Sequence, residues 1–141
     1  MIIQQLSVFL ENRTGRLSEV TAALAAQHIN ITALCIAETS DFGVLRMIVS
    51  DPAQAKAVLA GRGLSVSLTD VICLTVPDEP GALHRALQIL ADRSISIDYM
   101  YAFAAGKTAR VILRTSDAAR SVAALLEQKQ TLLSASDLYS I

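Results

Sequence analysis

Hydrophobic positions along the chain follow two different periods, and each change of period marks a new element. Stretches rich in branched apolar residues alternate with stretches in which apolar residues recur every three or four positions, as in an amphipathic helix. Glycine, proline, asparagine and aspartate gather between these stretches and indicate turns. In chain order the pattern predicts a strand over 3–10, a helix over 16–28, strands over 29–37 and 44–50 with a turn at 40–43 between them, a helix from Asp51 to Gly61–Gly63, and a strand from 65 to 68.

The same order of elements recurs 66 residues further along the chain. Gly15 corresponds to Gly81 in this comparison, and Asp51 corresponds to Asp117. A self-match at a fixed offset is typical of an internal duplication. The second copy predicts strands over 71–76, 95–103 and 109–115, a turn at 105–107, a helix that carries the stripe Leu83, Leu87, Leu90 and Ala91, a helix over 117–128, and a closing strand over 131–136.

Each copy therefore has the order strand, helix, strand, strand, helix, strand. With short connections, this βαββαβ order predicts an α+β, ferredoxin-like fold: an antiparallel sheet with both helices on one face. We expect two such units in tandem, over residues 1–69 and 70–141. Residues 65–76 are almost continuously strand-like, so the last strand of the first unit is expected to run into the first strand of the second.

The second face of the predicted sheets is apolar. Alternation along 29–37 places Ile31, Ala33, Cys35 and Ala37 on one face, yet Leu34 and Ile36 make the other face apolar as well. A sheet with one face in water would alternate with polar residues. We therefore expect another sheet, from a second copy of the chain, to cover the free face, which predicts a homodimer.

Composition narrows the function classes. The 141 residues carry 12 basic and 13 acidic side chains, and 52% of residues are hydrophobic. No basic stretch is available to neutralise a phosphate backbone, so we expect no nucleic-acid partner. The start of the chain has no basic segment before its apolar run, and the apolar stretches are too short for a membrane span, so we expect no signal peptide and no membrane partner.

The cysteines indicate a compartment. Cys35 and Cys73 are far apart in the sequence and form no metal-ligand spacing. Two reduced, buried thiols are typical of a cytoplasmic protein. Neither His28 nor His84 has a cysteine or carboxylate at ligand spacing, so no metal and no cofactor are expected.

The most promising chemistry lies where the first strand of each unit meets its first helix. The N-terminus of a helix presents unpaired N–H groups and a partial positive charge, which suits a carboxylate. Gly15 and Gly81 lack a Cβ, so ligand atoms can approach the backbone there. The amides of Asn12 and Asn30 can serve either end of a zwitterion. An alternative remains open, because asparagine and aspartate before a helix are also common simply as caps.

The residues at these junctions resemble the ACT domain family. The motif is a polar residue, Pro-Gly and an apolar residue, which reads Asp78-Glu79-Pro80-Gly81-Ala82-Leu83 in the second unit and Asn12-Arg13-Thr14-Gly15-Arg16-Leu17 in the first. The resemblance covers essentially the whole chain as two tandem copies. It implies a regulatory module that binds a small ligand, usually an amino acid, between paired units.

The first unit is most similar to the serine-sensing ACT domain of phosphoglycerate dehydrogenases. In that family the loop reads E-N-R-P-G and the second strand starts V-N-I, and two asparagines contact the ligand across the interface. This chain has Glu11-Asn12-Arg13-Thr14-Gly15 and Ile29-Asn30-Ile31, so the resemblance implies that Asn12 and Asn30 contact the ligand. Thr14 stands where the motif has proline, and the second unit has Asp78 and Ser96 where the first has asparagines.

These arguments give one set of expected ligand-binding residues. It comprises Asn12, Arg13, Thr14, Gly15, Arg16, Leu17, Asn30 and Ile31 in the first unit, and Asp78, Glu79, Pro80, Gly81, Ala82, Leu83 and Ser96 in the second.

We expect a sensor of free amino acids rather than an enzyme, because no catalytic motif is present. One alternative is a regulatory subunit similar to the small subunit of acetolactate synthase, which acts on a separate catalytic chain. Another alternative is an interaction module whose pockets are degenerate. The sequence leaves the identity of the amino acid open.

Overall fold

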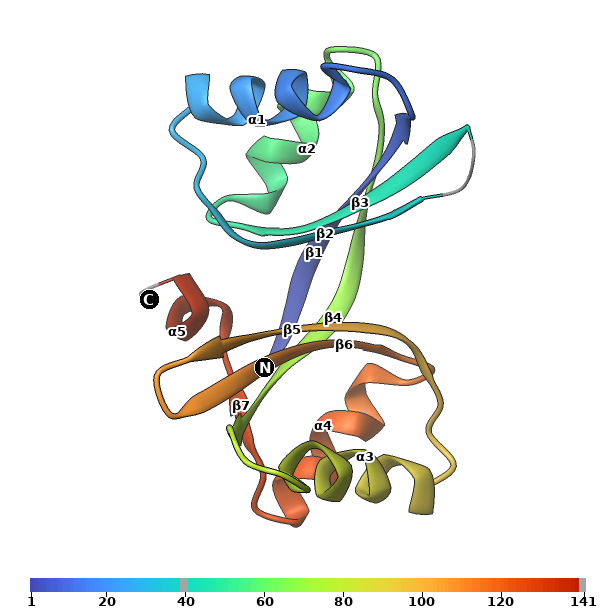
Figure 1. Ribbon diagram of the computed structural model, residues 1–141, viewed down its shortest axis with the longest axis vertical. Coiled ribbons are helices and arrows are strands. Elements are labelled where there is room, and N and C mark those ends of the chain that lie inside the picture. The colour runs from blue at the N-terminus through green and yellow to red at the C-terminus, as the bar shows by residue number, and fades with distance from the viewer. Residues whose placement is uncertain (39–40, 140–141) are drawn as a thin grey trace. The chain divides into compact units, whose positions relative to one another are not determined.

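A computed structural model describes residues 1–38 and 41–139, which group into two compact units. The N-terminal unit comprises Gln4–Thr69, and the C-terminal unit comprises Met1–Ile3 together with the chain from Asp70 onward (Figure 1). Residues 1–3, predicted in the first unit, thus group with the second. In the first strand, the residues that belong to the core of the N-terminal unit begin at Leu6.

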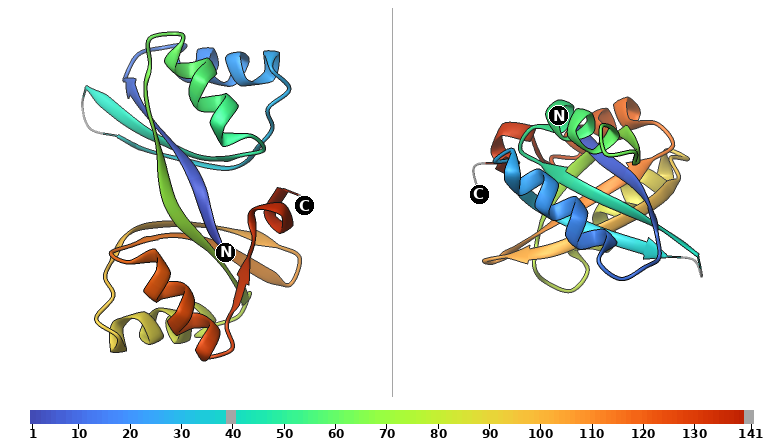
Figure 2. Two further views of the ribbon diagram at one scale, coloured as in Figure 1. Left: turned by 180° about the vertical axis from the view of Figure 1, so that it is seen from behind. Right: turned by 90° about the horizontal axis from the view of Figure 1, so that it is seen from above.

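The N-terminal unit has the predicted βαββαβ order. It contains β1 (Ile2–Glu11), α1 (Arg16–Ala26), β2 (Ile31–Glu38), β3 (Phe42–Val49), α2 (Pro52–Ala60) and the first part of β4 (Ser65–Pro77). Its strands lie in the order β2-β3-β1-β4, and β3 pairs with both β1 and β2 in antiparallel fashion. Helices α1 and α2 cover one face of this sheet, as the left view in Figure 2 shows.

The C-terminal unit repeats this arrangement. It contains the rest of β4, then α3 (Ala82–Asp92), β5 (Ile97–Ala105), β6 (Thr108–Thr115), α4 (Ala118–Glu127), β7 (Thr131–Leu133) and α5 (Ala135–Tyr139). Its strands lie in the order β7-β4-β6-β5. The predicted α+β class with two ferredoxin-like units is confirmed, and β4 is the continuous strand expected over residues 65–76.

Each unit has its own apolar core between sheet and helices. In the N-terminal unit Leu6, Val8, Leu45 and Met47 of the sheet are fully buried with Leu24 of α1. The corresponding residues of the C-terminal unit, Ile72, Leu74, Val111, Leu113 and Leu90, are buried in the same way. The duplicated apolar pattern therefore places the same positions in both cores.

The duplication also extends to the helix ends. Asp51 caps α2 through a hydrogen bond from the Gln54 N–H at 3.1 Å, and Asp117 caps α4 through one from the Arg120 N–H at 3.0 Å. Just after the C-terminal ends of α1 and α3, His28 and Ser94 both have φ near +56°. Helix caps 66 residues apart thus share one geometry.

A β-bulge corrects one prediction about the faces of β2. The register shifts between Ile31, which pairs with Val49, and Ala33, which pairs with Ile48. An extra residue in a strand moves the following side chains to the opposite face. Ile31 consequently packs against the helix-side core, away from the face predicted for it with Ala33, Cys35 and Ala37.

One turn and one strand end also differ from the predictions. Phe42 and Gly43 belong to β3 rather than to the predicted turn at 40–43, and Ser40 lies outside the described residues. The predicted strand over 131–136 ends at Leu133, where Ser134 caps the short helix α5. Ser134 accepts a hydrogen bond from the Asp137 N–H at 3.2 Å, a local side-chain bond that competes with further strand pairing.

Candidate functional site

The loop between β1 and α1 takes its shape from Gly15. This residue has φ +86° and ψ −8°, a left-handed conformation that disfavours residues with a Cβ, and it precedes α1 without offering a side-chain cap. Its carbonyl accepts the N–H of Glu19 at 3.0 Å, which starts the helix. The N–H groups of the first turn therefore receive no cap from the side chain at this position.

Backbone hydrogen bonds hold the rest of the loop. The Asn12 N–H donates to the carbonyl of Asp41 at 2.9 Å, and the Arg13 N–H donates to the carbonyl of Glu11 at 2.9 Å. The first bond joins the end of β1 to the segment before β3. The side chains of residues 12 and 13 are thus presented from a loop whose backbone is fixed at both strands.

A cleft of about 430 Å³, counting the open solvent within it, lies against this loop. Charged and polar groups share the cleft with an apolar wall formed partly by Leu17 and Ile36, which are 37% and 44% exposed. The lining consists of Leu10, Glu11, Asn12, Arg13, Arg16, Leu17, Ile36, Glu38 and Gly43.

Arg16 is the most enclosed cation of the cleft. Its side chain is 19% exposed, and its Nη1 lies 2.7 Å from Oε2 of Glu19 in the same first turn of α1. Its Nε is buried and has no hydrogen-bond partner among the described residues. Arg13, in contrast, is exposed and lies 3.7 Å from the carboxylate of Glu11. The cleft thus holds one oriented guanidinium and one exposed one.

The structure gathers only part of the predicted set of the N-terminal unit around the cleft. Asn12, Arg13, Arg16 and Leu17 line it, whereas Thr14 and Gly15 lie in the adjoining loop. Asn30 is exposed and does not line the cleft, and its N–H donates to Oγ of Ser50 at 2.9 Å. Ile31 is half-buried and packs on the core.

The equivalent junction of the C-terminal unit repeats the backbone but not the side chains. Gly81 has φ +87°, and the Asp78 N–H donates to the carbonyl of Lys107 at 2.9 Å. Glu79 pairs with Arg85 at 3.2 Å, and Pro80 is exposed beside it.

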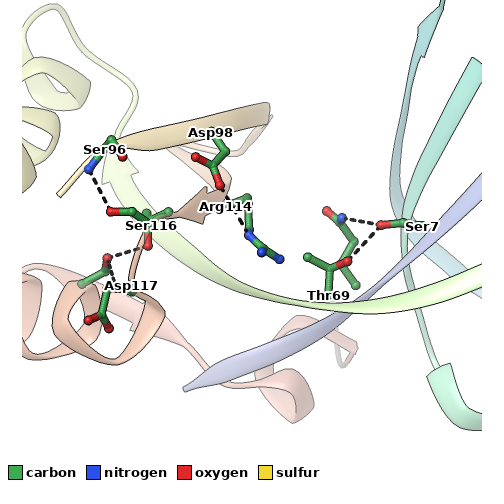
Figure 3. A network of polar contacts seen from close by, with 10 residues as sticks. Ser7, Thr69, Ser96, Asp98, Arg114, Ser116 and Asp117 are labelled. Atoms are coloured by element: carbon green, nitrogen blue, oxygen red, sulfur yellow. Dashed lines mark hydrogen bonds and ion pairs between the residues drawn. The ribbon is translucent and has the colours of Figure 1, made fainter.

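The remaining predicted residues of this unit begin α3 or precede β5. Ala82 is 3% exposed, and Leu83 packs against the core of the unit. The Ser96 N–H donates to Oγ of Ser116 at 3.1 Å, as Figure 3 shows. Ala82, Leu83 and Ser96 therefore make contacts that stabilise the fold of the unit.

Five lining residues of the N-terminal cleft escaped the sequence argument. Leu10 and Glu11 end β1, and Ile36, Glu38 and Gly43 come from β2 and β3, which pair with each other. Since Gly43 pairs with both Leu10 and Glu38, the sheet register brings these strand ends beside the loop. The alternation of apolar residues along 29–37 placed Ile36 on one face of the sheet, but it did not indicate that Ile36 lines a ligand site.

The described residues offer no cluster of three or more histidine, cysteine, aspartate or glutamate side chains that could hold a metal ion. Among the helices of residues 1–38 and 41–139, none is both long and apolar enough to cross a membrane. Cys35 is half-buried and Cys73 is buried, and both are free thiols. Burial raises the pKa of the Cys73 thiol to about 11, against a smaller opposing effect of Arg110.

The sequence of all 141 residues matches the family model described as an ACT domain pair. The chain belongs to the ACT domain pair family. A comparison with curated proteins finds no match.

Solved structures agree with this ACT domain pair. A protein from Bacteroides thetaiotaomicron is 48% identical, with a TM-score of 0.96 over 100% of this chain and 98% of that one. The ligand-free regulatory subunit of aspartate kinase from Thermus thermophilus is 17% identical, with a TM-score of 0.68 over 89% and 93% of the two chains. The regulatory subunit of aspartate kinase from Thermus flavus is 19% identical, with a TM-score of 0.59 over 89% and 90%. At these identities the two Thermus proteins show a shared fold.

Proposed function

We propose that this ACT domain pair is a regulatory protein that binds a free amino acid in the cleft at the start of α1. The observation that carries the proposal is the composition of that cleft. Two arginines, Arg13 and Arg16, and two carboxylates, Glu11 and Glu38, line one space together with apolar side chains. A zwitterion needs both signs of charge within a few ångströms, and guanidinium groups bind carboxylates through paired hydrogen bonds.

Pairing with a second copy of the chain completes the proposed site. Leu34 and Ile36 on β2 are 46% and 44% exposed, and β2 is the edge strand of its sheet. Exposed apolar side chains along an unpaired edge favour association with another chain. In a homodimer, Asn30 of one copy would contribute to the cleft of the other. Ligand binding then favours the paired arrangement and transmits occupancy.

A second candidate is a regulatory subunit that acts on a separate catalytic chain of amino-acid biosynthesis. The same exposed residues of β2 support it, because a catalytic subunit could cover them as well as a second copy could. The Thermus relatives carry the name of regulatory subunits of aspartate kinase, which is the architecture that this candidate requires. Both candidates place the protein in the cytoplasm and neither assigns it catalysis.

Calorimetric titration of the full chain with each of the twenty amino acids tests the proposal. We expect a saturable heat for at least one amino acid at millimolar concentration or below, and weaker binding in Asn12→Ala and Asn30→Ala. Gln88→Ala is the matched control, because it removes an exposed amide from α3 that does not line the cleft. The absence of heat for all twenty amino acids would contradict the proposal. Native mass spectrometry of the same sample distinguishes a homodimer from a complex with a catalytic chain.

A further inference from the structure

The two glycine turns have the same backbone but different surroundings. A Cβ placed on Gly15 would meet no atom within 4 Å, so the space above this turn is open. A Cβ placed on Gly81 would lie 3.1 Å from Nη1 of Arg85, whose other terminal nitrogen pairs with Glu79. The side chains of the C-terminal unit therefore cover their own turn, and those of the N-terminal unit leave theirs accessible.

The charges around the two turns are reversed. The N-terminal unit has Arg13 before the turn and Glu19 on the first turn of its helix, where the C-terminal unit has Glu79 and Arg85. The ion pairs differ as well: Glu19 pairs with Arg16 within α1, whereas Arg85 of α3 pairs with Glu79 of the loop before it. The first helical position carries Arg16 in one unit and the buried Ala82 in the other. A carboxylate would meet a largely enclosed guanidinium at the first helical position only in the N-terminal unit, because Arg85 is exposed and is paired with Glu79 over its own turn.

The walls of the two junctions differ as well. The positions of Ile36, Glu38 and Gly43 in the cleft correspond to alanines at 102, 104 and 109 in the C-terminal unit. The position of Glu11 corresponds to Pro77. The C-terminal junction consequently lacks both carboxylates and the branched side chain that line the N-terminal cleft.

The guanidinium of Arg16 has one donor without a hydrogen-bond acceptor among the described residues of the unit. Glu19 fixes one end of the guanidinium, and Nε is buried without a partner in the described part of the chain. A buried donor without an acceptor is costly, and a carboxylate can accept from two guanidinium nitrogens at once. The exposed carbons of Leu17 and Ile36 beside it would lose contact with water if an apolar ligand group covered them.

We infer that each chain binds a single amino acid, in the N-terminal unit alone, that Arg16 holds its carboxylate, and that its side chain is neutral and aliphatic. This inference rests on the proposed function and assigns the site, the stoichiometry and the ligand class within it. The side chain of the ligand packs on Leu17 and Ile36, and its ammonium group faces Glu11 and Glu38. The C-terminal unit serves as a structural copy whose junction is closed by Glu79 and Arg85.

The test compares titrations of the intact chain and three variants with valine, leucine, isoleucine, glutamate and lysine. We expect one ligand per chain and tighter binding of the three aliphatic amino acids than of the charged ones. Arg16→Ala should weaken binding by roughly ten- to a hundredfold, since hydrogen bonds to charged groups have that effect. Arg85→Ala is the matched control and should leave the dissociation constant unchanged, because it removes an exposed arginine from the same part of the other unit.

A variant that fills part of the cleft tests the binding of the ligand's side chain without changing any charged residue. In Gly43→Ala the added Cβ lies 3.5 Å from Cγ2 of Ile36, an ordinary contact without strain, and alanine already occupies the corresponding position 109. The fold should be retained, as circular dichroism would verify, while the aliphatic amino acids with the largest side chains lose affinity most.

Leucinamide assigns the role of Arg16, because it lacks the carboxylate. Leucinamide should bind the intact chain more weakly than leucine does, and Arg16→Ala should weaken leucine but not leucinamide. Equal losses for both ligands would overturn the role of Arg16. Two ligands per chain, a preference for charged amino acids, or loss of binding in Arg85→Ala alone would overturn the inference while leaving the proposed function intact. The absence of binding for every amino acid would overturn both.

Discussion

Asn30 and Ser50 exchange two hydrogen bonds where β2 begins and β3 ends. The Asn30 N–H donates to Oγ of Ser50 at 2.9 Å, and the Ser50 N–H donates to the carbonyl of Asn30 at 3.0 Å. Ser96 and Ser116 form the same pair in the C-terminal unit, at 3.1 and 2.9 Å. The position of Asn30 therefore has a structural contact that any residue with a backbone N–H can make, whereas the hydroxyl of Ser50 is specific.

Ser50→Ala should lower the free energy of unfolding by about 1 kcal/mol, because it removes the acceptor for the Asn30 N–H. Asn30→Ala should leave stability almost unchanged, since its backbone makes both bonds. Urea unfolding followed by circular dichroism measures both effects. An equal loss in the two variants would show that the Asn30 side chain stabilises the fold and would weaken its assignment to a ligand.

The left-handed turn before α1 predicts that substitutions of Gly15 lower stability by different amounts. Gly15→Ala should cost about 1–2 kcal/mol, because residues with a Cβ disfavour φ near +86° while no neighbouring atom resists the new carbon. Gly15→Asn should cost less, since asparagine adopts this conformation more readily. Thermal unfolding of the two variants gives the comparison. A larger loss for asparagine than for alanine would mean that space, rather than backbone conformation, limits this position.

The C-terminal end of α4 offers a stabilising substitution. Lys129 follows this helix with φ +61°, and glycine occupies the corresponding position 63 with φ +81°. In both places the next N–H donates back into the helix, from Gln130 to Leu125 at 2.9 Å and from Leu64 to Leu59 at 3.2 Å. Lys129→Gly should therefore raise the free energy of unfolding by roughly 0.5–1 kcal/mol, because glycine adopts this geometry without strain.

The reciprocal substitution serves as the control for Lys129. Gly63→Ala should lower stability by about 1–2 kcal/mol, as at Gly15, since no atom lies within 4 Å of the added Cβ and only the conformation opposes it. Guanidinium unfolding curves of both variants provide the measurement. A destabilised Lys129→Gly would indicate that the lysine side chain makes a contact that outweighs the backbone strain.

The sequence was sufficient for the fold because its main signals are local and repeated. Apolar spacing predicts the helices, and the offset between Gly15 and Gly81 aligns the two units. The β-bulge after Ile31 could not be read from alternation, because both possible faces of β2 carry apolar side chains. The short helix α5 escaped for another reason: Leu132 and Leu133 just before it are typical of a strand, and only the Ser134 cap ends that strand.

The candidate site was less accessible to sequence reasoning. Residues 12–17 are contiguous, so a motif could suggest them, and four of them line the cleft. Ile36, Glu38 and Gly43 join them only through the pairing of β1, β2 and β3. The contrast between the open turn at Gly15 and the covered turn at Gly81 depends on where the Arg85 side chain lies, which spacing along the chain does not determine.

Burial of Cys73 predicts a loss of stability at alkaline pH. The thiol is fully buried, and its pKa is raised from 9.0 to about 11 in the folded chain. Below pH 9 the thiol is protonated in both states and has no effect on stability. Above pH 9 the unfolded chain releases this proton while the folded chain retains it, so the free energy of unfolding falls by up to about 2–3 kcal/mol as the pH rises through 11.

Cys73→Ala isolates this contribution. The variant should be less stable than the parent at pH 7, because it leaves a small cavity, but its stability should decrease less steeply between pH 9 and 11. Cys35→Ala, which alters a half-buried thiol, is the matched control and should keep the steep decrease. Urea unfolding across this pH range measures the slopes. Equal slopes in the parent and Cys73→Ala would assign the alkaline loss to other groups and would show that the Cys73 thiol is less enclosed than its burial indicates.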